Sequence, residues 1–235
     1  MLAGRRALIT GASGGIGSAV SRALGAAGVA AVLVARRPGP LDALAAGIRG
    51  AVPFAADLTD AGAVRALVDA APDLLGGPVD LLVNNAGIFT LRPIEETEDR
   101  TLDAMLALNL AAPFRLVRAL LPAMRAAGRG HIVSIGSIAD RQAFPENGVY
   151  AATKFGARAM HEVLRAESRG SGVRSTLISP AATDTALWDP VEPGARGGIP
   201  PRSAMLDPAA VADAVLWAVT RAPDVNIDEM RLSFA

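Results

Sequence analysis

The stretch Thr10-Gly11-Ala12-Ser13-Gly14-Gly15-Ile16-Gly17 (TGASGGIG) decides the fold of this 235-residue chain. It follows the apolar run Ala7-Leu8-Ile9, which is consistent with a buried strand, and leads into an alanine-rich helical segment that ends near Gly25 to Gly28. A strand, a glycine-rich turn and a helix form the start of a βαβ unit, in which the turn and the helix N-terminus can bind a pyrophosphate. The spacing is GxxxGxG rather than GxGxxG, so a flexible glycine-rich turn is the alternative.

Further apolar runs alternate with helical segments along the rest of the chain. They predict strands at 30–35, 51–55, 80–83, 131–135, 173–179 and 225–232. Helices are predicted from a cap at Thr59 or Asp60 to Leu75, and over about 97–127, 149–168 and 208–220. This alternation predicts an α/β fold, a single doubly wound Rossmann-type domain over residues 1–235 with a seven-stranded parallel sheet flanked by helices.

The composition argues against several classes of protein. The chain is 51% hydrophobic, and its 23 basic residues balance 23 acidic ones, so we expect a large core and no nucleic-acid surface. It has no cysteine, which excludes disulfides and thiol catalysis. His131 and His161 lack the spacing of metal ligands, so we expect structural roles and no metal. The first residues fit neither a signal peptide nor a membrane span, and we expect a cytoplasmic protein without membrane contact.

The second predicted strand ends in two arginines, Arg36 and Arg37. In a dinucleotide-binding unit this strand end lies beside the adenosine ribose, where an acidic residue bonds a free 2′-hydroxyl and an arginine accommodates a 2′-phosphate. Because this strand end has neither Asp nor Glu, we expect NADP(H) to be preferred, with NAD(H) possible. A solvated pair of arginines before a Pro38-Gly39-Pro40 turn is the alternative.

Tyr150, the only tyrosine of the chain, stands four residues before Lys154 on a predicted helix. That spacing places both side chains on one face, one turn apart. A free phenol has a pKa near 10, and a nearby ammonium favours the phenolate and lowers that pKa. The pair therefore predicts a general acid/base. A tyrosine at an interface beside a solvated lysine is the alternative that this spacing leaves open.

Asn109 and Ser137 are further candidates for this site. Asn109 precedes Pro113 by four residues, and Pro113 has no N–H to give to the carbonyl of residue 109. If the helix continues there, that carbonyl needs a partner, of which an ordered water is the simplest; a plain helix break at Ala112 is the alternative. Ser137 follows the strand at 131–135 and lies thirteen residues before Tyr150, so its hydroxyl could lie beside the phenol.

The order of these motifs resembles that of the short-chain dehydrogenase/reductase family over nearly the whole chain. TGASGGIG (10–17) is similar to the cofactor-binding turn of that family, and NNAG (84–87) to its sheet-stabilising motif. Asn109, Ser137, Tyr150 and Lys154 match its catalytic tetrad residue by residue, and Asp57 matches the aspartate near the adenine ring. Two features depart from the family pattern. Pro180-Ala181 replaces a frequent Pro-Gly, and Gly14 stands where many NADP-preferring relatives carry a basic residue.

The resemblance implies an NADP(H)-preferring oxidoreductase acting on a small-molecule carbonyl or secondary alcohol. Tyr150 would exchange a proton with the substrate oxygen, and Ser137 would hydrogen-bond that oxygen. Lys154 would bond the nicotinamide ribose, and Asn109 would hold a water. Similar proteins are commonly tetramers, sometimes dimers, so a homo-oligomer is expected. The alternatives are an NAD-dependent alcohol dehydrogenase using the same site and a non-catalytic nucleotide-binding regulator.

The expected cofactor and substrate contacts come from several separate segments. Cofactor contacts are expected at Gly11, Ser13, Gly15, Ile16, Gly17, Arg36, Arg37, Asp57, Leu58, Asn84, Ala86, Gly87, Tyr150, Lys154, Pro180, Thr183 and Thr185. A long irregular segment rich in proline and glycine predicts a lid at about 183–206, although a disordered segment is the alternative. Walls for a small or medium apolar substrate are expected at Phe89, Phe144, Leu187 and Trp188.

Overall fold

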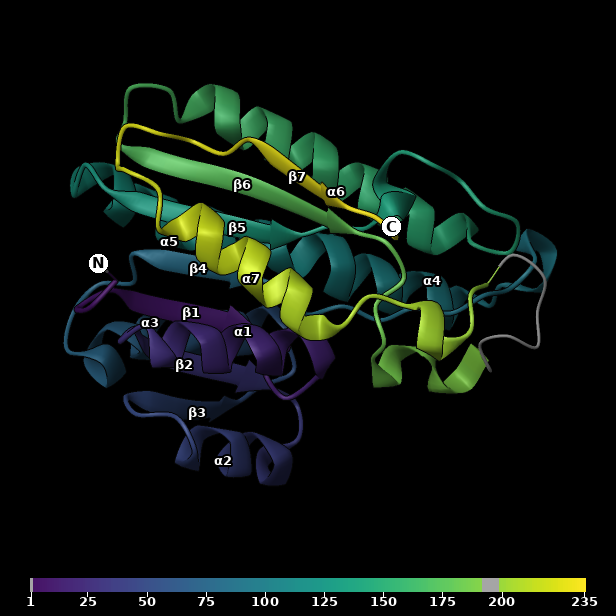
Figure 1. Ribbon diagram of the computed structural model, residues 1–235, viewed down its shortest axis with the longest axis horizontal. Helices are drawn as coiled ribbons and strands as arrows, with labels where there is room; N and C mark the ends of the chain where they lie inside the picture. Colours follow the sequence, from purple (N-terminus) through teal and green to yellow (C-terminus); the bar gives the residue numbers. More distant parts are fainter. Residues whose placement is uncertain (1, 192–198) are drawn as a thin grey trace.

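The computed structural model describes residues 2–191 and 199–235 and has a seven-stranded parallel sheet with helices on both faces (Figure 1). The strands are β1 (Arg6–Thr10), β2 (Ala30–Ala35), β3 (Ala51–Ala55), β4 (Leu81–Asn84), β5 (Gly130–Ile135), β6 (Val173–Pro180) and β7 (Glu229–Leu232). The α-helices are α1 (Gly15–Ala26), α2 (Pro38–Ala46), α3 (Ala61–Leu75), α4 (Asp99–Leu106), α5 (Ala112–Ala126), α6 (Gly148–Glu167) and α7 (Pro208–Val219). The predicted α/β fold with a seven-stranded parallel sheet is confirmed.

Alternate residues of the strands face two different layers of helices. In β1, Leu8 is buried in a cluster that includes Leu67 of α3 and Leu116 of α5. Its neighbour Ile9 is buried in a second cluster, which includes residues of α1, α2 and α7 such as Val215. Figure 1 shows α1 and α7 crossing in front of the sheet. Because both faces of the sheet are covered, its strands read as near-continuous apolar runs in the sequence.

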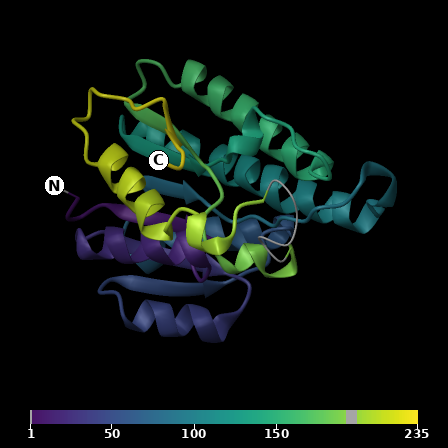
Figure 2. The same cartoon turned by 45° about the vertical axis from the view of Figure 1, so that its right-hand side comes forward.

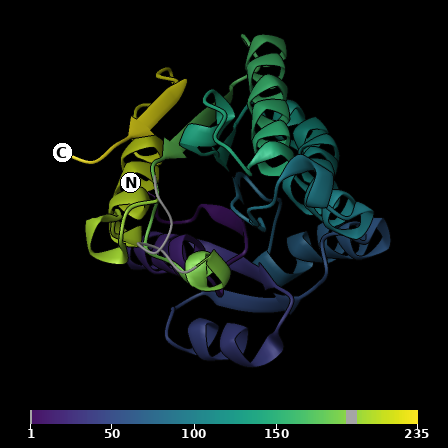
Figure 3. The same ribbon diagram turned by 90° about the vertical axis from the view of Figure 1, so that its right-hand side faces the viewer.

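The strand order reverses between β1 and β4. The order across the sheet is β3-β2-β1-β4-β5-β6-β7, so the chain builds outward from β1 on one side and later from β4 on the other. Ligands of open α/β sheets bind outside the carboxyl ends of the strands at such a reversal. Figure 3 looks onto this edge, with the short 3₁₀-helix η4 (Ala186–Val191) in the foreground.

The long predicted helix continues through Pro113 rather than breaking at Ala112. The π-helical turn η2 (Ala107–Ala111) joins α4 to α5, and Asn109 lies within it. Figure 2 shows α6 lying beside this helical stretch. The stretch Asp99–Ala126 is long and apolar enough to cross a membrane by length and composition. Its buried residues include Leu116, which belongs to the same cluster as Leu8 of β1, as expected of a core helix.

Three local predictions differ from the structure. The Pro38-Gly39-Pro40 segment begins α2 instead of forming a turn, because a proline at the first helical position loses no hydrogen bond. The last strand begins at Glu229, not at 225, because the Asn226 side chain pairs with the N–H (2.9 Å) and carbonyl (3.1 Å) of Ser175 in place of backbone. Within the predicted lid, η4 and the 3₁₀-helix η5 (Arg202–Ala204) give regular structure, while 192–198 lie outside the described residues.

Candidate active site

A large cavity lies at the carboxyl edge of the sheet, at the reversal between β1 and β4. Its volume is about 960 Å³, and its walls come from the turn after β1, the ends of β2, β5 and β6, the loop after β4, the start of α6 and the segment around η4. Sites for small molecules and cofactors usually measure roughly 300–1,000 Å³. The cavity is therefore large enough for a dinucleotide-sized ligand together with a smaller one.

Glycines let the turn after β1 approach the loop after β4. Gly11 has a φ of 64°, and a Cβ added there would lie 2.8 Å from Nδ2 of Asn85. A Cβ on Gly17 would lie 2.1 Å from the carbonyl oxygen of Gly11, so the first turn of α1 packs directly on the preceding turn. Gly14 is the N-cap of α1 and gives no side-chain cap, so the first N–H groups of this helix remain available to a ligand.

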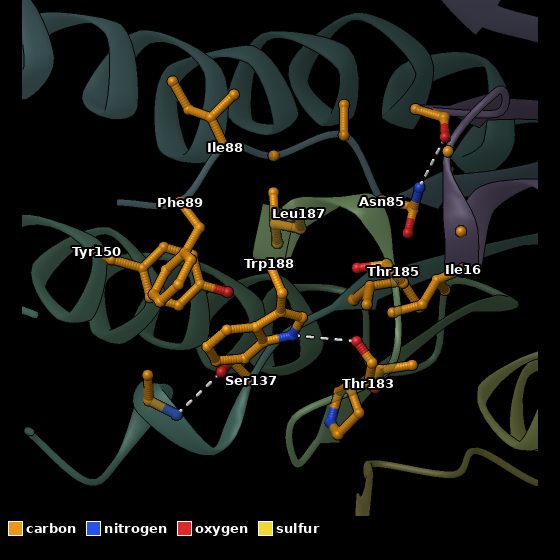
Figure 4. Close-up of a pocket in the computed structure, with 18 of the residues that line it drawn as sticks. Ile16, Asn85, Ile88, Phe89, Ser137, Tyr150, Thr183, Thr185, Leu187 and Trp188 are labelled. Atoms are coloured by element: carbon orange, nitrogen blue, oxygen red, sulfur yellow. Dashed lines mark hydrogen bonds between the residues drawn. The ribbon is translucent and has the colours of Figure 1, made fainter. Parts of the chain in front are cut away.

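Thr10 and Asn85 lock the glycine-rich turn to the loop after β4. Thr10 Oγ1 accepts hydrogen bonds from the backbone N–H groups of Asn85 and Ala86, each at 3.0 Å. Asn85 Nδ2 donates to the carbonyls of Thr10 at 2.9 Å and Gly11 at 3.2 Å. Asn85 therefore lines the large cavity (Figure 4), although we predicted its neighbour Asn84 there. The Asn84 side chain lies in a separate small cavity, because successive residues at a strand end point to opposite sides.

Arg36 and Arg37 line one end of the cavity, together with Ala56 and Leu58. Asp57 does not line it, because its carboxylate accepts hydrogen bonds from the backbone N–H (2.9 Å) and the hydroxyl (2.8 Å) of Thr59. These bonds hold the pKa of Asp57 below its ordinary value, and the charge of Arg36 lowers it further. This end of the cavity therefore offers two guanidinium groups to an anion.

At the other end, α6 and the tip of β5 bring three predicted residues to the same wall. Lys154 is buried and donates to the carbonyl of Ile135 at 3.0 Å, and its Nζ lies 5.5 Å from the centroid of the Tyr150 ring. Ser137 Oγ accepts the N–H of Ala139 at 3.1 Å. Figure 4 shows the hydroxyl groups of Ser137 and Tyr150 both pointing into the cavity. The one-face geometry expected for Tyr150 and Lys154 is thus present.

Asn109 does not line the large cavity. Its side chain instead bonds the loop after β4 and α6, which form part of the cavity wall. Its Oδ1 accepts the N–H of Ile88 at 2.9 Å. Its Nδ2 donates to the carbonyl of Ile88 at 2.9 Å and to Oγ1 of Thr153 at 3.3 Å. The π-helical turn thereby ties the loop after β4 to α6, the helix that carries Tyr150.

A second, much smaller cavity lies between η2 and α6. It measures about 20 Å³, and Asn84, Asn109, Pro113 and Lys154 are among its lining residues. Among the described protein atoms, neither end of the Asn84 amide finds a hydrogen-bond partner. A volume of roughly 10–15 Å³ with polar partners is enough for one water molecule. The small cavity is therefore large enough for one water, the partner expected for the carbonyl of Asn109 if the helix continues through Pro113.

Aromatic side chains form a wall on the substrate side of Tyr150. The Phe89 ring meets the Tyr150 ring edge-on, with centroids 4.9 Å apart, and meets the Trp188 ring at 5.0 Å. The Trp188 indole N–H donates to the carbonyl of Thr183 at 3.1 Å, which fixes the orientation of the ring (Figure 4). All four predicted substrate contacts line the cavity, namely Phe89, Phe144, Leu187 and Trp188.

Most of the predicted cofactor contacts line the large cavity as well. They are Gly11, Ser13, Gly15, Ile16, Gly17, Arg36, Arg37, Leu58, Ala86, Gly87, Tyr150, Lys154, Pro180, Thr183 and Thr185. Other residues that line the cavity were not predicted from the sequence. They include Asn85, Ile88, Leu91, Ile138, Ile199 and Phe234. The alternation of side chains at a strand end could have indicated Asn85, whereas no motif marks the others.

Neither histidine lines the cavity. His131 is fully buried, and its Nε2 lies 2.8 Å from Oγ1 of Thr176. Burial, with the charges of two nearby arginines, lowers the pKa of His131 to about 3. His161 bonds to the hydroxyl of Ser175 at 2.9 Å, and burial lowers its pKa as well. Over residues 2–191 and 199–235, no group of three His, Cys, Asp or Glu side chains could hold a metal ion.

Comparisons with known proteins agree with this architecture. Residues 5–195 match the family model described as short chain dehydrogenase. A D-threitol dehydrogenase from Mycolicibacterium smegmatis is 40% identical over 200 residues, which are 83% of this chain and 76% of that protein. A glycine betaine reductase from Emericella nidulans is 36% identical over 97% of this chain, which spans only 18% of that protein's length.

A solved structure of similar size completes the comparison. The crystal structure of a metagenomic short-chain oxidoreductase in complex with NADP is 34% identical in sequence and superimposes with a TM-score of 0.84. The match covers 100% of this chain and 99% of that one. The shared fold therefore includes every element that lines the cavity.

Proposed function

Because the chain belongs to the short-chain dehydrogenase/reductase family, we propose that it is an NADP(H)-preferring oxidoreductase that interconverts a carbonyl and a secondary alcohol. The observation that carries the proposal is the wall where Ser137, Tyr150 and Lys154 meet in a cavity whose other end presents Arg36 and Arg37. One wall supplies groups that hold and move a proton. The other end supplies the cations that a 2′-phosphate requires.

The residues present fit a dinucleotide phosphate. The uncapped N-terminus of α1 faces the cavity, and the turn before it packs closely because Gly11 and Gly17 lack side chains. Arg36 and Arg37 would hold the 2′-phosphate, and Lys154 the nicotinamide ribose. When bound, NADPH supplies the hydride that reduces a carbonyl carbon, and NADP accepts it in the reverse direction.

Tyr150 and Ser137 would act on the substrate oxygen. The Ser137 oxygen already accepts the N–H of Ala139, so its own hydroxyl proton remains to be donated to an oxygen on which negative charge develops. Tyr150 would give its proton to that oxygen in reduction and take it back in oxidation. The Lys154 ammonium, 5.5 Å from the phenol ring, would stabilise the phenolate left behind.

Asn109 and Lys154 would connect the phenol to solvent. Both line the small cavity of about 20 Å³, and a water there would reach the π-helical turn and the region of the Lys154 ammonium. The Asn109 side chain is engaged with Ile88 and Thr153, so only its backbone carbonyl is available for such a water. The proton lost by Tyr150 would be replaced along this route.

The substrate would be a small or medium apolar molecule beneath a lid at about 183–206, within one domain that spans the chain. The aromatic wall of Phe89, Tyr150 and Trp188 supports an apolar substrate, because the Trp188 N–H is already paired. The names of the relatives described above refer to different compounds. The proposal of an apolar substrate therefore rests on the cavity wall alone.

We further propose a homo-oligomer, a tetramer or a dimer, in the cytoplasm. Large apolar side chains are exposed on the helical stretch of α4 and α5 and on α6: Leu102, Leu106, Phe114, Phe155 and Val163. Burying them between subunits would remove apolar surface from water. Light scattering during size-exclusion chromatography measures the mass, and a monomer at micromolar concentration would contradict this proposal.

A fluorescence titration with NADPH and with NADH tests the proposed function first. We expect clearly tighter binding of NADPH, followed by oxidation of bound NADPH when ketones and aldehydes are screened. Tighter NADH would overturn the cofactor preference and favour an NAD-dependent alcohol dehydrogenase with the same acid/base residues. Binding of neither would favour a regulator or an inactive relative.

A further inference from the structure

A buried carboxylate lies directly behind Ser137. Asp140 has no exposed surface, although it is the last residue of the short 3₁₀-helix η3 (Ile138–Asp140), which follows Ser137. An acidic side chain is seldom fully buried unless its oxygens are paired. The sequence motifs do not explain an acid at this position, and Asp140 does not line the cavity.

Both oxygens of Asp140 are engaged, with the two residues that flank η3 and with β6. Oδ1 accepts the Nε–H of Arg141 at 2.9 Å. Oδ2 accepts the hydroxyl of Ser179 on β6 and makes a long hydrogen bond of 3.5 Å with the N–H of Ser137. Together with the bond from the Ala139 N–H to Ser137 Oγ, this closes a capping box around Ser137.

The backbone around Ser137 is shaped to admit this carboxylate. A Cβ added to Gly136 would lie 2.7 Å from Asp140 Oδ2 and 2.8 Å from Ser179 Oγ. The Asp140 oxygen and the Ser179 hydroxyl thus occupy the space where a side chain at residue 136 would be. The absence of a side chain at Gly136 lets the tip of β5 close onto β6 through Asp140.

The network continues from Asp140 to the edge strand. Arg141 Nη2 donates to Oε2 of Glu229 on β7 at 3.0 Å. The hydrogen bond to Asp140 raises the pKa of Arg141, with smaller help from Glu229. Asp140 therefore cross-links the tips of β5 and β6 and, through Arg141, the start of β7.

We propose that Asp140 is the positioning residue for Ser137 and sets the direction in which the Ser137 hydroxyl donates its proton. This inference rests on the proposed function, because Ser137 is the group that touches the substrate oxygen. Asp140 bonds the N–H of Ser137 and fixes the turn of η3. The Ala139 N–H therefore keeps its hydrogen bond to the Ser137 oxygen, and the Ser137 hydroxyl proton remains available to the substrate. Without the carboxylate, the hydroxyl could rotate toward other acceptors.

A double-mutant cycle tests whether Asp140 acts through Ser137. Kinetics with NADPH and a ketone from the screen are compared for wild type, Asp140→Asn, Ser137→Ala and the double variant. We expect Ser137→Ala to lower kcat about 100-fold, as for loss of one oxyanion donor. Asp140→Asn should lower kcat about tenfold with KM and the Kd for NADPH within about twofold, and the double variant should match Ser137→Ala, because the two groups are coupled.

The outcomes separate failure of this inference from failure of the proposed function. Losses that multiply in the double variant would assign Asp140 an independent structural role and overturn the inference, as would an unchanged kcat in Asp140→Asn. A wild-type kcat in Ser137→Ala would contradict the proposed function itself, and the inference with it. Neither result can be mistaken for the other, because they are read from different variants.

A matched control and a measurement without substrate complete the test. Arg141→Met removes the partner of Asp140 Oδ1 but leaves Oδ2 with Ser137 and Ser179, so kcat should change by no more than about threefold. In the NADPH-bound protein, amide exchange of the segment 136–141 should be faster in Asp140→Asn than in Arg141→Met. Equal protection of this segment in both variants would overturn the inference without any activity assay.

Discussion

The two ends of the large cavity are built in different ways. At the end near Arg36, the walls are the glycine-rich turn after β1, whose Gly11 and Gly17 pack closely on backbone, together with Arg36 and Leu58 from the ends of β2 and β3. At the end near Tyr150, the walls are side chains from four separate segments, which include Phe89, Ser137 and Trp188. The first end therefore depends on close backbone contacts of one turn, and the second on how side chains of distant elements pack.

This difference has a consequence for how each end responds to mutation. In the glycine-rich turn, a Cβ added at Gly11 or Gly17 would lie within 3 Å of backbone atoms, so substitutions at these two positions should disturb ligand binding and the fold together. At the Tyr150 end, a side chain can be trimmed without moving the backbone, so substitutions should change chemistry while binding and stability survive. Four changes test this contrast, from the largest expected effect to the smallest.

Replacing Tyr150 with Phe should give the largest effect and confine it to chemistry. Loss of a general acid typically lowers the rate by about 10²–10⁴-fold. The packing of the ring on Phe89 should survive, because only the hydroxyl is removed. We therefore expect kcat to fall about 1,000-fold while the Kd for NADPH, measured by fluorescence, stays within twofold. Turnover within a few-fold of wild type would contradict the assignment of Tyr150.

Replacing Gly17 with Ala should couple binding to stability. The added methyl would lie 2.1 Å from the Gly11 carbonyl, and such overpacking typically costs about 1–3 kcal/mol. We expect the free energy of unfolding in urea to fall by about 2–3 kcal/mol and NADPH binding to weaken at least tenfold.

Gly14→Ala is the matched control for this substitution. A Cβ there would lie 3.7 Å from the nearest atom, the Gly11 carbonyl oxygen, so the free energy of unfolding should fall by no more than about 1 kcal/mol, the usual cost of alanine at an N-cap. Equal destabilisation by the two substitutions would break the contrast between the ends, because the glycine-rich end would then not depend on close backbone contact at Gly17.

Lowering the pH should weaken both ends together, because both rest on the same sheet. His131 on β5 has a pKa of about 3 in the folded protein, against an ordinary value of 6.5. Between these values the unfolded chain binds a proton that the folded chain does not, so stability falls as pH falls, by about 1.4 kcal/mol per unit. At pH 5 the titration of His131 should therefore have lowered the free energy of unfolding by about 2 kcal/mol relative to pH 6.5 and above.

His131→Gln isolates this contribution in urea unfolding at pH 7 and pH 5. The variant keeps a polar group near Thr176 and removes the titrating ring. Its free energy of unfolding should lose about 2 kcal/mol less than wild type over this interval. A parallel decline in both proteins would show that His131 does not titrate between folded and unfolded states as its burial requires.

Replacing Arg36 with Asp should give the smallest effect and the most selective one. The carboxylate would repel a 2′-phosphate in place of a cation that attracts it, at an exposed site where the interaction is screened. We expect NADPH to bind about tenfold more weakly and NADH to change by less than threefold. An equal loss for both cofactors would mean that Arg36 contributes to the fold of this end and does not read the phosphate.

Much of this arrangement could be predicted from local sequence. The seven strands, the glycine-rich turn and the helical spacing of Tyr150 and Lys154 follow from patterns within about twenty residues. Such patterns are informative because a buried strand or an amphipathic helix imposes a short, fixed period on its side chains. The same reasoning misplaced Asn84, although the alternation of side chains along a strand would have put Asn84 and Asn85 on opposite sides.

Some features needed contacts between residues far apart in the chain. The choice between a break at Ala112 and a continuous helix was open in sequence, and packing against α6 and the loop at Ile88 accompanies a π-helical turn there. Asn226 ends the last strand early because its side chain replaces backbone in pairing with Ser175. Neither outcome could be read from propensity, since each depends on a partner supplied by another element.

The sequence by itself determined the fold class, the family and the glycine-rich turn and Tyr150/Lys154 pair of the cavity, because glycine torsions, strand periods and a Tyr/Lys spacing act within single elements. Only the tertiary structure decided that Asp140 bonds Ser179 of β6, that Phe89 stands between Tyr150 and Trp188, and that Asn85 faces the glycine-rich turn. These contacts join residues of separate elements. Their geometry exists only after the helices have packed on the sheet and brought the strand ends to one edge.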